Sequence, residues 1–162
     1  MNFSLMRFAA TRRLILQGAG SVALAGLGNL LSLPALAAAG GKYPDDAFRQ
    51  KGDKDAIQAL YGKAAEPSDK VKLDAPEIAE NGAVVPISVT TTLENVTSIS
   101  FLVSGNPNAL AASYQIPEGT LPAVANRLKM QQTSNVIAIV EAGGKLYSAT
   151  KEVKVTVGGC GG

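Results

Sequence analysis

The sequence predicts an all-β protein, an immunoglobulin-like β-sandwich of about seven strands, preceded by one or two short N-terminal helices and followed by a flexible C-terminal tail. Three observations support this class. Beyond residue 67 the apolar residues recur with period two, which is typical of half-buried strands. Turn residues separate these runs at intervals of roughly ten residues, which favours a sandwich over a small barrel. The chain then ends in a glycine-rich stretch, residues 158–162.

Residues 1–37 are predicted to be an export signal. Arg12 and Arg13 stand directly before a weakly apolar stretch rich in glycine and alanine, and this arrangement is similar to a twin-arginine signal peptide. We expect cleavage after Ala37 or Ala39, and a periplasmic location. A membrane anchor is not expected, because a spanning helix needs about 20 strongly apolar residues and glycines interrupt this stretch.

The charge balance of the mature chain argues against nucleic acid as a partner. The full sequence has 15 basic and 13 acidic residues, and the signal contains three of the basic ones, Arg7, Arg12 and Arg13. The mature net charge is therefore 12 − 13 = −1. We expect no nucleic-acid binding, because such binding needs a basic surface.

Residues 42–66 are predicted to be a helical segment. Asp53 is expected to cap a helix that Gly62 ends. The residues expected to share one face of this helix are Ala56, Ile57, Leu60 and Tyr61.

Residues 67–157 are predicted to form the sandwich. Asn81 and Gly82 supply a turn between the first two strands. The alternating sets that mark the first five strands are Val71 and Leu73; Val85, Ile87, Val89 and Thr91; Ile99, Phe101 and Val103; Leu110, Ala112, Tyr114 and Ile116; and Val124, Asn126, Leu128 and Met130.

The last two strands are predicted to form a hairpin. Residues 136–140 are apolar on both faces, which suits a central strand. Gly143 and Gly144 form the tight turn that joins them to residues 145–157. Lys151 interrupts the apolar row of the last strand, which predicts a sheet edge or a bulge there.

The absence of histidine and the presence of one cysteine exclude most catalytic chemistry. Histidine metal sites, Ser-His-Asp and Cys-His catalysis and internal disulfides all need residues that the sequence lacks. We expect no bound metal or cofactor. The chain is therefore predicted not to be an enzyme.

The only cysteine, Cys160, lies in the glycine-rich tail. Gly158 and Gly159 precede it, and Gly161 and Gly162 follow it. Glycine has wide backbone freedom and no side chain to anchor, so the tail is predicted to be a flexible arm that presents the thiol to solvent. Cys160 is the candidate for covalent substrate attachment. An intermolecular disulfide that cross-links a binding or structural module remains the alternative.

The chain resembles the SoxY family of sulfur-compound carriers. The similarity rests on the twin-arginine signal, on the stretch from Ala75 to Pro86 and above all on the ending Lys154-Val155-Thr156-Val157-Gly158-Gly159-Cys160-Gly161-Gly162. The resemblance implies a periplasmic carrier that forms a heterodimer with SoxZ, a second small immunoglobulin-like protein.

The same resemblance implies which enzymes act on the carrier. A c-type cytochrome couples thiosulfate to Cys160, and a dimanganese hydrolase releases sulfate. A sulfane dehydrogenase oxidises the remaining persulfide in organisms that have one. The sulfur adducts on Cys160 would be a thiosulfonate and a persulfide.

Overall fold

The computed structural model describes residues 43–157. The predicted export signal and the glycine-rich arm lie outside the described residues. Within this range the helices are α1 (Asp45–Phe48) and α2 (Asp53–Tyr61). The strands are β1 (Glu66–Pro67), β2 (Val71–Asp74), β3 (Ile78–Ala79), β4 (Val85–Thr91), β5 (Val96–Val103), β6 (Leu110–Gln115), β7 (Ala123–Leu128), β8 (Ser134–Ala142) and β9 (Lys145–Val155).

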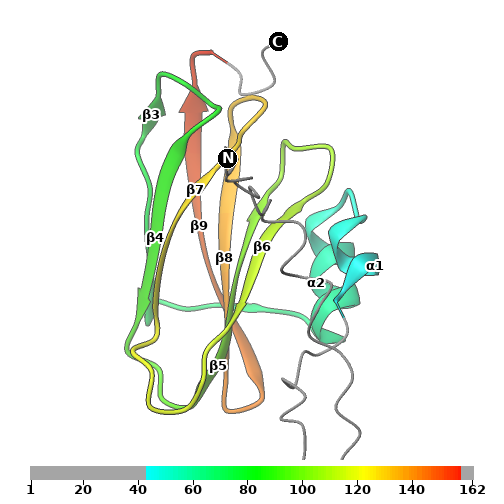
Figure 1. The fold of residues 1–162 in the computed structure, drawn as a ribbon, viewed down its shortest axis with the longest axis vertical. Helices are drawn as coiled ribbons and strands as arrows, with labels where there is room; N and C mark the ends of the chain where they lie inside the picture. The colour runs from blue at the N-terminus through cyan, green and yellow to red at the C-terminus, as the bar shows by residue number, and fades with distance from the viewer. Residues whose placement is uncertain (1–42, 158–162) are drawn as a thin grey trace, which may run out of the picture. The chain divides into compact units, whose positions relative to one another are not determined.

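The strands form two sheets that pack into a sandwich (Figure 1). The larger sheet has the order β1-β9-β8-β5-β6, with β3 also paired to β9, and the smaller sheet has the order β2-β4-β7. Seven of these strands have four residues or more, and each coincides with one predicted from the period-two pattern. The predicted fold class, including the two short N-terminal helices, is confirmed.

The hairpin between β8 and β9 follows from its two glycines. Gly143 and Gly144 have φ values of 55° and 76°, in the left-handed region that residues with a Cβ seldom adopt. Two consecutive residues of this kind make the tight turn whose twist matches the flanking strands. The prediction of a hairpin at this point is confirmed.

The main core lies between the two sheets and is built from the inward-facing residues of the alternating sets. Phe101 is fully buried, and its ring meets that of Tyr114 edge to face at 6.3 Å. Asn126 also points inward, where its amide donates to the Tyr114 hydroxyl at 2.8 Å. The other fully or nearly buried members include Val85, Val89, Ile99, Val103, Met130, Val136, Val140 and Val153.

A second apolar cluster lies between the helices and the outer face of the larger sheet. Figure 1 shows both helices on one side of the sandwich, next to β6. Leu102, Ile139 and Leu146 are buried there against Ala47 of α1 and Ala56 of α2. This second layer explains why β8 is apolar on both faces, because one face meets the other sheet and the opposite face meets the helices.

The start of α2 differs from the prediction that Asp53 caps it. The N-cap is Gly52, whose carbonyl accepts from the Ala56 amide at 2.9 Å, and Asp53 is the first helical residue. The Asp53 carboxylate instead accepts a hydrogen bond from the Ser104 hydroxyl at 2.6 Å. Asp53 was therefore wrongly predicted as the cap, and its side chain connects α2 to the end of β5. Gly62 ends the helix with φ 71°, as predicted.

The chain crosses between the sheets three times from β1 to β4, and Lys151 stabilises the second crossing, from β2 to β3. β9 pairs in parallel with β1 at residues 147–148 and with β3 at residues 154–155. Lys151 lies between these two pairings, on an open stretch of the β9 edge, and its ammonium donates to the carbonyl of Ala75. The register of β8 and β9 is unbroken, so the lysine marks an edge and not a bulge.

Candidate functional site

Cys160, the predicted attachment residue, lies outside the described residues, as do Gly158, Gly159, Gly161, Gly162, Arg12 and Arg13. The structure describes the chain as far as Val157, three residues before the cysteine. The candidate site is therefore the end of β9, from which the arm leaves the domain.

Two segments from earlier in the sequence hold one side of this end. β3 pairs in parallel with it, with Ala79 opposite Val155. The Thr156 amide donates to the Ala79 carbonyl at 3.1 Å, and the Thr156 hydroxyl donates to the Glu80 carbonyl at 2.9 Å. The backbone and the side chain of Thr156 are thus bonded to the last residue of β3 and to the residue that follows it.

The turn after β3 holds the last described residue. The Gly82 amide donates to the Val157 carbonyl at 2.8 Å, and the Gly82 carbonyl accepts from the Met130 amide at 2.7 Å. Asn81 shapes this turn, because its side-chain oxygen accepts from the Ala83 amide at 2.8 Å. The Asn81-Gly82 turn read from the sequence therefore positions the start of the arm.

The loop between β7 and β8 supports the other side of the same end. The Thr133 hydroxyl accepts from the Val155 amide at 2.9 Å, directly before Ser134 begins the pairing with Val153. Hydrogen bonds from both sides thus fix the backbone of β9 up to Val157. These hydrogen bonds hold Val157 in one position relative to the sandwich, and we call this position the origin of the arm.

Apolar side chains are exposed around this origin. Ile78 of β3, Val84 before β4 and Val157 after β9 are exposed by 58%, 53% and 64%. We call these three residues the arm-base rim. Single exposed apolar residues are ordinary, but three on the segments around one chain end are a local concentration.

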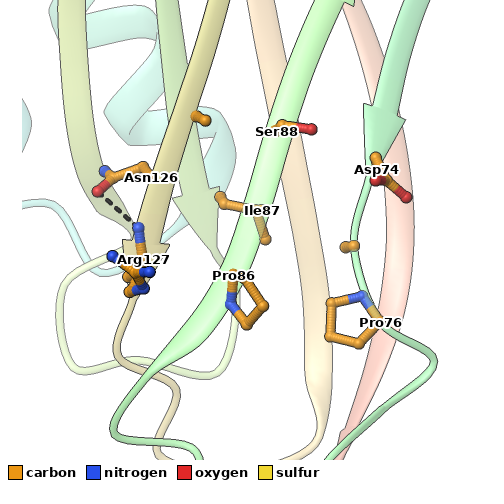
Figure 2. A pocket seen from close by; sticks show the side chains of 9 residues that line it. Asp74, Pro76, Pro86, Ile87, Ser88, Asn126 and Arg127 are labelled. Atoms are coloured by element: carbon orange, nitrogen blue, oxygen red, sulfur yellow. Dashed lines mark hydrogen bonds between the residues drawn. The ribbon is translucent and has the colours of Figure 1, made fainter.

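An open groove of about 640 Å³ is lined by residues of β2, β4 and β7 and by the segment that follows β2 (Figure 2). Pro76 and Pro86 stand on its two sides, two residues before Ile78 and two residues after Val84. Pro86 has no amide hydrogen, and the pairing of β2 with β4 ends at Ser88. The charged or polar residues of the lining are Asp74, Ser88, Asn126 and Arg127. The lining contains no thiol and no imidazole.

A polar network lies beneath α2, and the sequence did not reveal it. The Tyr61 hydroxyl shares hydrogen bonds with Ser98 at 3.1 Å and Ser100 at 2.7 Å, and Ser100 donates to Ser113 at 2.8 Å. Burial raises the pKa of Tyr61 above its ordinary value of 10.0, with a further rise from the Glu141 carboxylate, and the serine hydrogen bonds oppose the shift. The network fastens α2 to the larger sheet.

The described range contains no group of three or more His, Cys, Asp or Glu side chains placed to hold a metal ion. Among residues 43–157, no helix has both the length and the apolar character needed to cross a membrane.

Together the fold and the site define a class: a small immunoglobulin-like β-sandwich protein whose last strand leads directly into a single terminal cysteine. The family described as "Sulfur oxidation protein SoxY" matches residues 57–160, so the matched stretch ends at Cys160. The chain belongs to this SoxY family of sulfur oxidation carrier proteins, and the resemblance read from the sequence is confirmed.

A solved structure of the sulfur carrier protein SoxY from Chlorobium limicola f thiosulfatophilum is similar over most of the domain. It is 43% identical with a TM-score of 0.57, and the match covers 64% of this chain and 94% of that chain. Two other solved structures are much less similar to this chain. A Jonesia denitrificans lytic polysaccharide monooxygenase is 10% identical with a TM-score of 0.37, over 49% of this chain and 56% of that one. The Thermotoga petrophila endo-β-1,4-mannanase is 10% identical with a TM-score of 0.41, over 64% and 23%. No curated protein gave a significant match.

Proposed function

We propose that this protein carries sulfur intermediates covalently on Cys160 while partner enzymes oxidise and hydrolyse them to sulfate. One observation supports this most directly: the family match extends to Cys160, three residues beyond Val157, whose carbonyl accepts a hydrogen bond from Gly82. A thiol that must visit several active sites needs a fixed origin and a short reach. Three extended residues reach roughly 10 Å.

The chemistry begins with oxidative coupling. The Cys160 thiol and thiosulfate form a sulfur–sulfur bond, giving Cys-S-S-SO₃⁻ with release of one proton and two electrons to the c-type cytochrome. Water then attacks the terminal sulfonate at the dimanganese hydrolase. Sulfate and a proton leave, and a persulfide remains on the cysteine.

The second half of the cycle restores the thiol. In hosts that have a sulfane dehydrogenase, the persulfide anion and three waters give Cys-S-SO₃⁻, six protons and six electrons. A second hydrolysis releases sulfate and returns Cys160 to the thiol. Because the chain has no histidine and no second cysteine, every catalytic group in this scheme belongs to a partner.

The proposal includes the location and the stable partner. Arg12 and Arg13 direct the chain to the periplasm through the twin-arginine pathway, and a SoxZ-like protein forms a heterodimer with it there. These assignments follow from the signal sequence and from the family to which the chain belongs.

The test compares the wild type with Cys160→Ser in the native host growing on thiosulfate. Intact-mass measurement before and after reductant should detect sulfur and thiosulfonate adducts on Cys160, and the variant should lose thiosulfate-dependent sulfate formation. The control is Cys160→Ser combined with Thr120→Cys, which places a thiol on an exposed position in the β6–β7 loop. Sulfate formation rescued by that misplaced thiol, or a wild-type rate in Cys160→Ser, would contradict the carrier proposal in favour of cross-linking.

A further inference from the structure

The surface around the end of β9 has the character of a docking site. Ile78, Val84 and Val157 are three of the five exposed large apolar residues in the described range. The other two are Tyr43, which precedes α1, and Leu121 in the β6–β7 loop, which Figure 1 shows at the end of the sandwich opposite β3. Hydrogen bonds to β3 and Gly82 hold the rim in one arrangement. The rim is therefore preformed in the free protein.

The short chain between Val157 and Cys160 indicates which kind of partner would contact this surface. Cys160 is three residues from Val157, so the chain between them can span at most roughly 10 Å. Ile78 pairs with Lys154, three residues before Val157, and Val84 follows two residues after Gly82. A protein that encloses the sulfur of Cys160 must bring its own surface against these residues.

We infer that the arm-base rim, with the groove between Pro76 and Pro86, is the docking surface for the active-site entrance of an enzyme that acts on the Cys160 adduct. The inference rests on the proposed function, because it takes Cys160 as the loaded residue. The enzyme surface that would complement it is a ring of apolar side chains around a narrow active-site channel. One side chain of the enzyme would enter the groove between Pro76 and Pro86.

The size of the rim favours a transient partner over a permanent one. Three exposed side chains and an open groove are less than the large apolar interface that a permanent subunit requires. A carrier that must leave each enzyme after one step needs weak contact of this kind. A SoxZ-like subunit, which would stay bound, is expected on another part of the surface.

The test separates docking from chemistry. Treatment with tetrathionate loads Cys160 without any enzyme. The thiolate attacks a central sulfur of tetrathionate, thiosulfate leaves, and the cysteine becomes Cys-S-S-SO₃⁻. The loaded carrier, in complex with its SoxZ-like partner, is then given to the host's sulfate-releasing hydrolase. The variants are Ile78→Thr with Val84→Thr, which keep β-branched side chains, and Ile78→Asp, which adds a charge. Leu121→Thr and Leu121→Asp are the matched controls.

The rim variants are expected to lower kcat/KM by about tenfold, mainly through KM, while the Leu121 variants keep the wild-type value. Loading by tetrathionate, the melting temperature and the affinity for the SoxZ-like partner should not change. An unchanged kcat/KM in both rim variants, an equal loss in the Leu121 variants, or a loss of the SoxZ-like partner would each overturn the inference. If the wild-type adduct released no sulfate at all, the proposed function would fail instead.

Discussion

The amide of Gly82 donates to the carbonyl of Val157 at 2.8 Å, which joins a turn in the first half of the domain to the last residue before the arm. The neighbouring residue Thr156 strengthens this connection, because its hydroxyl donates to the carbonyl of Glu80 in the segment before the turn. The origin of the arm is thus determined by residues about 75 positions away in the sequence. We therefore expect substitutions of the residues that make these hydrogen bonds to loosen the chain near Val157 more than they loosen the core.

Replacing Thr156 with Val is expected to loosen this end. Valine keeps the shape of threonine but loses the hydrogen bond to Glu80, which should lower the free energy of unfolding by about 0.5–1.5 kcal/mol. Amide hydrogen exchange at Gly82 should accelerate. Thr150→Val, at an exposed threonine within β9, serves as the control. Equal exchange rates at Gly82 in the two variants would contradict the role of Thr156.

Replacing Lys151 with Met is expected to weaken the crossing from β2 to β3. Methionine fills a similar volume but leaves the carbonyl of the buried Ala75 without its donor, a loss of about 1–2 kcal/mol in the free energy of unfolding. Lys154→Met, on an exposed position, should stay within about 0.5 kcal/mol. Urea denaturation of the two variants side by side measures the difference, and similar values would show that the contact with Ala75 adds nothing.

Replacing Tyr61 with Phe is expected to change how stability depends on pH. The raised pKa of Tyr61 means that the folded state keeps its proton where the unfolded state loses it, so the wild type loses stability as the pH rises above about 10. Phenylalanine should cost about 1 kcal/mol at neutral pH through lost hydrogen bonds. The gap between the two proteins should then narrow between pH 10 and the folded pKa, because only the wild type has this phenol to ionise. Urea denaturation from pH 7 to pH 11 tests this, and a gap that stays constant would be the contrary result.

Replacing Gly161 with Val tests whether the arm must be thin, and it rests on the proposed function. Gly161 follows Cys160, so the change cannot shorten the reach of the thiol, but it adds a branched side chain beside it. Sulfate release by the hydrolase should fall, with a smaller fall for Gly161→Ala. Reaction of the free thiol with a small disulfide reagent should stay at the wild-type rate. Hydrolase rates that do not depend on the size of residue 161 would remove this requirement.

The fold was readable from the sequence wherever local pattern determined it. The longer strands follow from alternation such as Val85, Ile87 and Val89, and the hairpin follows from Gly143 and Gly144, because both signals lie within a few residues. The two-residue strands β1 and β3 were not predicted. A two-residue strand has no period, and its pairing depends on β9, which is about 75 residues further along the chain.

The site was only partly readable. The sequence named Cys160 and the Asn81-Gly82 turn, but not that this turn bonds to Val157. Val84 precedes the buried Val85, so its exposure follows from the period-two pattern of β4. Ile78 looks like a core residue by composition, and its two-residue strand has no period that would show which way it faces. The role of Lys151 was visible only as an interruption, because its acceptor is a backbone carbonyl that no sequence pattern marks.

The parallel pairing of β9 with both β1 and β3 has a consequence for how the protein is made. β9 follows every other described strand in the sequence, and β1 and β3 from the start of the sandwich pair with no other strand. A chain that stops before β9 therefore lacks the arm and also leaves β1 and β3 unpaired at the border of the larger sheet. Incomplete copies should be open to proteases along residues 66–79, so that a copy that survives in the cell is one that carries a thiol.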